Sequence, residues 1–112
     1  MRPKIEITIR GSKRSIQIEA IVDSGFEGQF CVPMDVASWV GAVTLGWGEM
    51  ELADGNKVFV PTVACDVEML GTMASVKAFI TDAQDPIIGT KLLEGFLLTV
   101  DFDSGNVQLK RK

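Results

Sequence analysis

Alternation of polar and apolar residues over several long segments is the feature that most limits how this chain can fold. A strand places successive side chains on opposite faces of a sheet, so a period of two predicts half-buried β-strands. Turn-forming residues separate these segments and predict four hairpins. The chain is therefore expected to be mainly β, as a small barrel or a sandwich. The alternating segments are "KIEITIR" (4–10), "SIQIEAIV" (15–22), "KVFVPTVACDVEM" (57–69) and "ASVKAFI" (74–80), and the turns are "RGSKR" (10–14), "ADGN" (53–56), "LGTM" (70–73) and "DSGN" (103–106).

Two short segments are predicted as helices, "PMDVASWV" (33–40) and "TKLLEG" (90–95), because a glycine closes each of them. Three apolar runs interrupt the alternation at residues 20–22, 86–89 and 95–100, and such runs predict central strands that are buried on both faces. The chain has 112 residues with no internal repeat and no linker, so residues 1–112 are expected to form one domain.

Composition removes several classes of function. The chain has no histidine, which excludes Ser-His and Cys-His nucleophile pairs, imidazole general bases and most zinc sites. The formal net charge is -4, and the only basic cluster is "KRK" at residues 110–112, so nothing predicts nucleic-acid binding. Catalysis in such a chain has to use carboxylates.

Cys31 and Cys65 lie among apolar neighbours and far apart in the sequence, which predicts buried free thiols of the kind found in a reducing compartment. The N-terminal segment alternates instead of carrying an apolar signal core, and no apolar run approaches the roughly 18 residues of a membrane span. The expected protein is soluble and cytoplasmic, without a membrane partner.

The tripeptide Asp-Ser-Gly occurs twice, at residues 23–25 and 103–105. The second copy joins two predicted strands among polar neighbours, so Asp103 is predicted to be an ordinary turn residue. Asp23 instead follows a buried apolar run, where an unpaired carboxylate is costly, and Gly25 and Gly28 behind it allow a tight turn. Two interpretations of Asp23 stay open at this point: a functional carboxylate, or a structural residue that forms an Asx-turn or caps the strand end.

Three segments in this order resemble the retropepsin-like aspartic proteases. "AIVDSGFEGQFCVP" (20–33) is similar to their active-site segment, "ELADGNKVFVP" (51–61) to their flap hairpin, and "DPIIGTKLLEGFLLTVDF" (85–102) to their apolar pair, glycine, helix and final strand. Phe26, Gly28 and the flap sequence most resemble the short single-domain cellular members of archaea and bacteria. The resemblance implies a small closed β-barrel of the acid-protease type with one or two short helices.

The resemblance also implies an activity. Aspartic proteases hydrolyse peptide bonds with two carboxylates that share one proton, one acting as base on a water and the other as acid. Only Asp23 has the required setting, so the second carboxylate is expected from a second copy of the chain, in a symmetric homodimer. A bell-shaped pH dependence with an acidic optimum is expected, and no cofactor or metal.

By the same resemblance, Ser24 hydrogen-bonds across the dimer interface and Gly25 offers its carbonyl to an extended peptide or protein substrate. Trp47 and Phe59 either brace the flap or pack as ordinary hydrophobic residues. The terminal segments "KIEITI" (4–9) and "NVQLK" (106–110) are expected to pair between subunits. The expected substrate-binding residues are Phe26, Glu27, Gly28, Ala53, Asp54, Gly55, Asn56, Ile87 and Ile88.

Two other functions are compatible with parts of the sequence. A non-catalytic module would keep the fold and dimerise or bind peptides, but a binder has no need of two like charges forced together. A metal or phosphate site has little support, because the remaining acids are scattered and match no ligand spacing. The acids concerned are Asp54, Asp66, Asp82, Asp85 and Asp101.

Overall fold

The structure is a computed structural model that describes residues 2–52 and 54–112. Within these ranges the chain forms nine strands and two short helices, so the expectation of a mainly β protein is confirmed. The strands are β1 (Lys4–Arg10), β2 (Ser15–Val22), β3 (Phe30–Pro33), β4 (Val43–Glu51), β5 (Lys57–Met69), β6 (Thr72–Thr81), β7 (Ile87–Ile88), β8 (Phe96–Val100) and β9 (Val107–Arg111), and the helices are α1 (Met34–Val40) and α2 (Thr90–Leu93).

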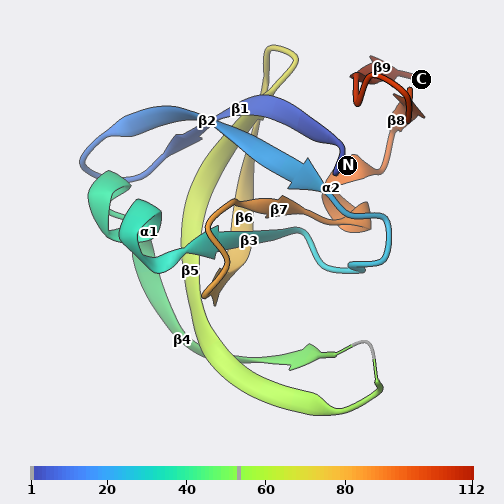
Figure 1. Ribbon diagram of the computed structural model, residues 1–112. Coiled ribbons are helices and arrows are strands. Elements are labelled where there is room, and N and C mark those ends of the chain that lie inside the picture. The colour runs from blue at the N-terminus through green and yellow to red at the C-terminus, as the bar shows by residue number, and fades with distance from the viewer. Residues whose placement is uncertain (1, 53) are drawn as a thin grey trace.

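Six strands close into a barrel (Figure 1). One sheet has the order β1-β2-β7-β3-β6-β5-β4, and β1 pairs a second time with β5, which closes the ring and leaves β4 as an extension of β5. The pairing is antiparallel except for β2 with β7 and β3 with β6. The closed barrel that the resemblance implies is therefore present, and the alternative of a sandwich is wrong.

The core fills the barrel with one face of each alternating strand. Ile9, Phe30, Val32 and Ile88 are each 0% exposed. Removing such a side chain from water contributes roughly 1.5–3 kcal/mol. Helix α1 lies against the barrel with Val36, Ala37 and Val40 buried, and it ends at Gly41, whose φ of 77° is easy only for glycine. The predicted helix at residues 33–40 is thus confirmed to within one residue.

Two of the three apolar runs form buried central strands, and the third does not. Ala20, Ile21 and Val22 are buried, and β7 lies between β2 and β3 in the middle of the sheet, as predicted. The prediction for residues 95–100 is wrong, because β8 pairs only with β9 in a separate two-stranded sheet. Its side chains alternate between half-buried and exposed, and Leu97 is 53% exposed.

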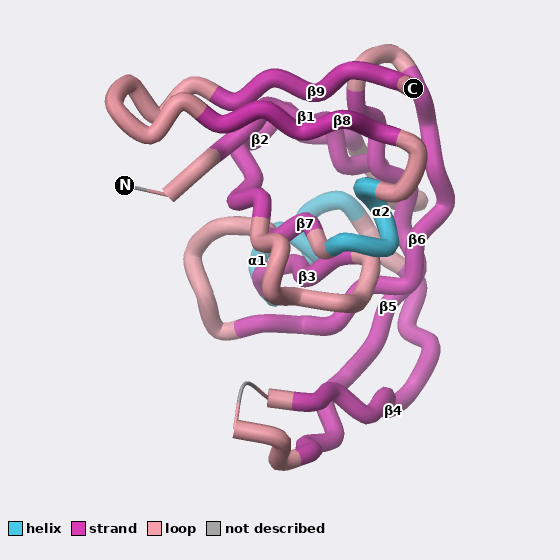
Figure 2. Tube along the Cα trace, turned by 90° about the vertical axis from the view of Figure 1, so that its right-hand side faces the viewer, coloured by secondary structure: helices cyan, strands magenta, loops and turns pink. Residues whose placement is uncertain are grey.

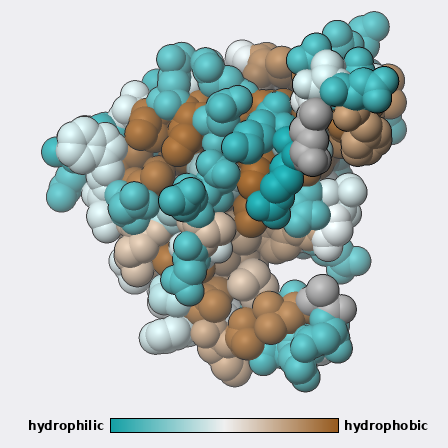
Figure 3. Space-filling view, viewed as in Figure 1, coloured by the Kyte–Doolittle hydropathy of each residue, from teal (hydrophilic) through white to brown (hydrophobic). Residues whose placement is uncertain are grey.

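Strand β4 is the element that the sequence pattern missed. Its inward positions include Gly46 and Gly48, so the apolar half of the alternation is absent. Gly48 is needed there, because a methyl group would lie 2.5 Å from Cγ2 of Thr62. Strands β4 and β5 continue past the barrel as a long hairpin, and the space-filling view shows a hollow between this hairpin and the body (Figure 3).

Trp47 and Phe59 do not pack in the core. They lie on one face of the β4–β5 hairpin, where Trp47 opposes Pro61 and Phe59 opposes Glu49, and they are 72% and 69% exposed. Strand β1 is also used within the chain, because it pairs along its whole length with β2 and at residues 8–10 with β5. No helix in the described part of the chain is long and apolar enough to cross a membrane.

Candidate active site

Asp23 stands where β2 leaves the barrel. Strand β2 runs parallel to β7, with Ile21 opposite Ile87 and Val22 opposite Ile88. The backbone N–H of Asp23 continues this ladder and donates to the carbonyl oxygen of Ile88 at 3.0 Å. The central position of β7 therefore fixes the backbone of Asp23 to the most buried part of the sheet.

The loop after Asp23 is held to the segment that joins β7 to α2. The N–H groups of Gly89, Thr90 and Lys91 donate to the carbonyl oxygens of Gln29, Phe26 and Gly28 at 3.0, 2.8 and 3.2 Å. These bonds bring together the two sequence segments that most resemble aspartic proteases. The loop is rigid for a physical reason, since its carbonyls are satisfied by neighbouring backbone rather than by water.

The Asp23 carboxylate is half-buried, while Ser24 and Glu27 beside it are exposed. Its Oδ1 accepts a hydrogen bond from the N–H of Gly25 at 2.9 Å, which is the turn expected under the structural interpretation. Within the described residues no hydrogen bond engages Oδ2. The carboxylate is thus oriented through one oxygen and remains open to a water or a second carboxylate through the other.

Ile87 and Ile88 separate into two roles. Neighbouring residues of a strand point to opposite faces, and the side chain of Ile88 is 0% exposed inside the barrel. The expectation that Ile88 binds substrate is therefore wrong; its backbone carbonyl supports Asp23 instead. Ile87 is half-buried on the opposite face and stays a candidate.

The predicted flap is a tight hairpin. Leu52 donates to the carbonyl of Asn56 at 2.7 Å, and Asp54 accepts two bonds from Asn56, both at 2.9 Å. Gly55 has a φ of 87°, and Ala53 lies outside the described residues. Figure 1 shows this hairpin and the loop that follows β2 on the same side of the barrel. Figure 2 shows the hairpin extending away from the strands of the barrel.

The second Asp-Ser-Gly copy is a hairpin turn between β8 and β9, as predicted. Asp101 accepts the N–H groups of Asp103 and Ser104 at 3.0 and 3.4 Å, and these bonds lower the pKa of the Asp101 carboxyl. Gly105 closes the turn with a φ of 80°. Asp103 itself is exposed, so this copy has neither the buried strand nor the paired loop of the first.

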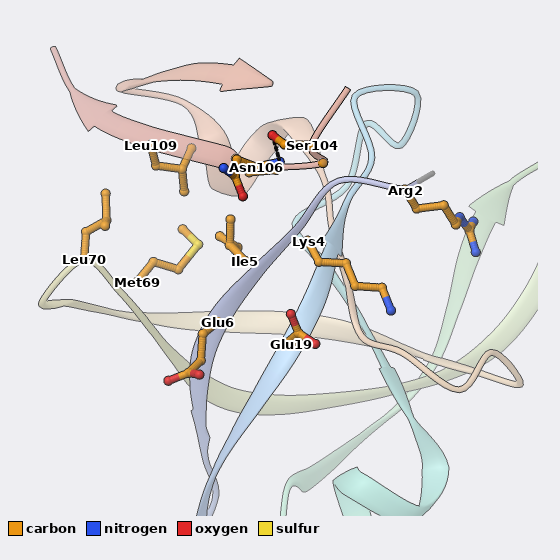
Figure 4. A pocket seen from close by; sticks show the side chains of 12 residues that line it. Arg2, Lys4, Ile5, Glu6, Glu19, Met69, Leu70, Ser104, Asn106 and Leu109 are labelled. Atoms are coloured by element: carbon orange, nitrogen blue, oxygen red, sulfur yellow. Dashed lines mark hydrogen bonds between the residues drawn. The ribbon is translucent and has the colours of Figure 1, made fainter. Parts of the chain in front are cut away.

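A hollow of about 510 Å³ lies between the barrel and the β8–β9 hairpin (Figure 4). Ile5, Met69, Leu70 and Leu109 gather at one end, while Arg2, Lys4 and Glu19 line the other. Asp23 and its loop do not line this hollow. This hollow and the predicted catalytic residues are therefore separate.

Four of the five acids considered for a metal site have other partners: Asp54, Asp66, Asp85 and Asp101. Among residues 2–52 and 54–112, no three cysteine or acidic side chains are grouped to hold a metal ion. Asp85 pairs with Lys4 at 3.5 Å, and Asp66 accepts the hydroxyl of Ser75 at 2.8 Å. The geometry gives the metal interpretation no support.

Cys31 of β3 is 5% exposed, and Cys65 of β5 is 6% exposed; both are buried free thiols, as predicted. Burial raises the pKa of Cys31 from 9.0 to about 11, with a smaller contribution from the Asp23 charge. Burial raises the pKa of Cys65 from 9.0 to about 11, with a smaller contribution from Asp66.

We expect both thiols to alkylate about 10²-fold more slowly in the folded protein than in urea near pH 8, because raising the pKa reduces the thiolate fraction. The pKa of each thiol is higher in the folded than in the unfolded protein. The two neutral thiols therefore stabilise the fold below pH 9.0, and this contribution is lost as the pH rises toward 11. Mass spectrometry of iodoacetamide-treated protein measures the rates, and equal folded and unfolded rates would contradict the burial. Asp23→Asn should accelerate Cys31 alone.

Sequence reasoning missed two residues that shape the site. Gln29 accepts the N–H of Lys77 with its side-chain oxygen at 3.0 Å, which ties the end of the loop to β6. Phe79 of β6 contacts Phe26, with ring centroids 6.4 Å apart. Both contacts join segments about 50 residues apart, and no local pattern marks them.

Comparison with known proteins shows the fold. No family model matches the chain, and no curated protein matches it. The structure of EIAV protease complexed with the inhibitor HBY-793 aligns with a TM-score of 0.67 at 12% identity, covering 84% of this chain and 86% of that one. The solution structure of Simian Foamy Virus (mac) protease aligns with a TM-score of 0.60 at 13% identity, covering 80% and 90%.

A third structure, the foamy viral protease-reverse transcriptase in complex with an RNA/DNA hybrid, aligns with a TM-score of 0.59 at 12% identity. The alignment covers 81% of this chain but only 12% of that much longer one. The closed barrel, the two short helices and these alignments together define the retropepsin-like protease fold.

Proposed function

We propose that this protein is an aspartic endopeptidase of the short cellular type, active as a homodimer that contributes one Asp23 from each subunit. One observation carries the proposal: in a retropepsin-like fold, a half-buried carboxylate follows a buried strand and its loop is hydrogen-bonded to the β7–α2 segment. The whole chain, residues 1–112, would be one such domain.

In this mechanism a water lies between the two Asp23 carboxylates. One carboxylate removes a proton from the water, which attacks the peptide carbonyl, and the other, protonated, donates to the carbonyl oxygen. The tetrahedral intermediate then breaks to a carboxylic acid and an amine. Because the pair works only with one proton between them, activity should follow a bell-shaped pH profile with an acidic optimum.

The other residues would bind an extended peptide. Ser24 is exposed next to Asp23, which suits a hydrogen bond across a subunit interface, and Gly25 would offer its carbonyl to the substrate. The flap tip, residues 53–56, would close over the peptide and exclude water. Glu27 and Ile87 would border the bound strand.

The direct test is cleavage of an unstructured protein such as casein from about pH 3 to 7 at high protein concentration. Cleavage with an acidic optimum supports the proposal. A folded protein that dimerises and binds peptides without cutting them at any pH would instead be a non-catalytic module, in which the hydrogen bond from Gly25 to Asp23 only shapes the turn. The two free thiols suit a reducing location, and we propose the cytoplasm.

Mixing subunits tests whether two chains build one site. We expect the activity of wild type mixed and refolded with the Asp23→Asn variant to fall as the square of the wild-type fraction, because every mixed dimer lacks one carboxylate. Casein cleavage at constant total protein measures this dependence. A linear decrease would mean that each chain acts alone, and dilution should separately lower the specific activity of wild type.

A further inference from the structure

The backbone of Phe26 is fixed relative to Asp23. Its N–H donates to the carbonyl of Asp23 at 3.2 Å, and its own carbonyl accepts the N–H of Thr90 at 2.8 Å. Bonds to both backbone groups hold Phe26 at a defined place in the turn that follows Asp23. The direction of its side chain is then set by what the ring packs against.

Two glycines make room for the Phe26 ring. A methyl group at Gly28 would lie 2.5 Å from Cζ of the ring, and one at Gly89 would lie 2.6 Å from Cδ2. The ring thus lies against the loop and the start of α2 instead of extending into solvent. Phe26 remains half-buried, so part of it is open to solvent.

Phe79 supports the ring from β6. The two rings meet edge to face, with centroids 6.4 Å apart and planes at 65°, a favourable aromatic geometry. Phe79 also reaches the hairpin, because a methyl group at Gly48 of β4 would lie 3.0 Å from its Cε1. Phe26 and Phe79 therefore form a continuous apolar wall from the Asp23 loop to the base of the β4–β5 hairpin.

We propose that this wall, Phe26 backed by Phe79, is a specificity determinant that fills one subsite beside Asp23 and admits only a small substrate side chain there. The inference rests on the proposed function, since it concerns where an extended peptide lies between the loop and the hairpin. The substrate class is an extended polypeptide with Gly, Ala or Ser at that position, because a larger side chain would overlap the ring.

Cleavage-site mapping by mass spectrometry on an unfolded protein and a peptide library tests this assignment. Phe26→Ala should raise kcat/KM about tenfold or more for peptides with Leu or Phe at one position relative to Ala there. Phe79→Ala should also raise kcat/KM for peptides with Leu or Phe at that position relative to Ala, because Phe26 loses its support. Phe26→Leu provides a milder change if the alanine variant does not fold.

Phe102→Ala is the matched control, since Phe102 is 75% exposed in the turn after β8 and its loss should leave the cleavage sites unchanged. Asp23-dependent cleavage with the same site preferences in wild type and in folded Phe26 variants would overturn the subsite assignment and leave the protease proposal intact. Absence of cleavage by folded wild type would overturn the protease proposal, and the subsite assignment with it.

Discussion

Replacing Asp23 by Asn is expected to reduce peptide-bond cleavage by about 10² to 10⁴-fold, the range typical of losing a general acid or base. The amide cannot exchange the proton that the two carboxylates share. Its side-chain oxygen can still accept the N–H of Gly25 that Oδ1 accepts at 2.9 Å, so the loop should keep its shape. Casein cleavage and circular dichroism, measured on the same samples, separate the two effects.

Asp103→Asn is the matched control for this variant. It alters the same tripeptide, but in an exposed hairpin turn that is held by Asp101. We expect its cleavage rate to equal that of wild type. Equal loss of activity in both variants would show that the effect does not arise from the Asp23 site, and full activity in Asp23→Asn would remove Asp23 from the mechanism.

The second large effect is expected for Gly89→Ala. A methyl group at Gly89 would overlap the carbonyl oxygen of Gly28 and would lie 2.8 Å from that of Phe26. These two carbonyls accept the N–H groups of Lys91 and Thr90, so moving them breaks the bonds that hold the loop. We expect a loss of about 3 kcal/mol or more in the free energy of unfolding, together with loss of cleavage.

Urea unfolding followed by fluorescence measures this free energy. Gly71→Ala is the control, because nothing lies within 4 Å of a methyl group there and only its φ of 76° is unfavourable. Its cost should be about 1 kcal/mol. Gly89 has a φ of -96°, which other residues adopt easily, so its cost should come from the contact with Gly28 alone. A loss no larger than that of Gly71→Ala would show that the loop moves to accommodate the methyl group and would contradict this role of Gly89.

The alternation of polar and apolar residues was enough to predict most of the long strands. Strands β1, β2, β5 and β6 follow the alternating segments closely, because each has one face in the core and one in water. Strand β4 was not predicted because glycines occupy two of its inward positions: Gly46 has a φ of 102°, and at Gly48 the packing of Thr62 and Phe79 leaves no room for a side chain. That packing is a tertiary property, and the sequence of β4 does not record it.

Some residues of the candidate site could also be predicted from the sequence, and others could not. Asp23, Gly25 and Gly28 could be singled out because a carboxylate directly after a buried run is unusual and needs an explanation. The different roles of Ile87 and Ile88 could not be predicted, because a strand of two residues shows no alternation that would indicate which side chain is buried. Gln29 and Phe79 were missed because their partners are distant in the sequence.

By itself, then, the sequence determined a mainly β chain, its principal strands and turns, and a difference in setting between two identical tripeptides. Those properties depend on neighbouring residues and on the two-residue period of a strand. Only the tertiary structure decided that the barrel closes, through pairing of β1 with β5, and that β8 leaves the core. It alone brought Gly89 and Phe79 against Phe26 in the loop that follows Asp23, because contacts between distant segments form only when the whole chain packs.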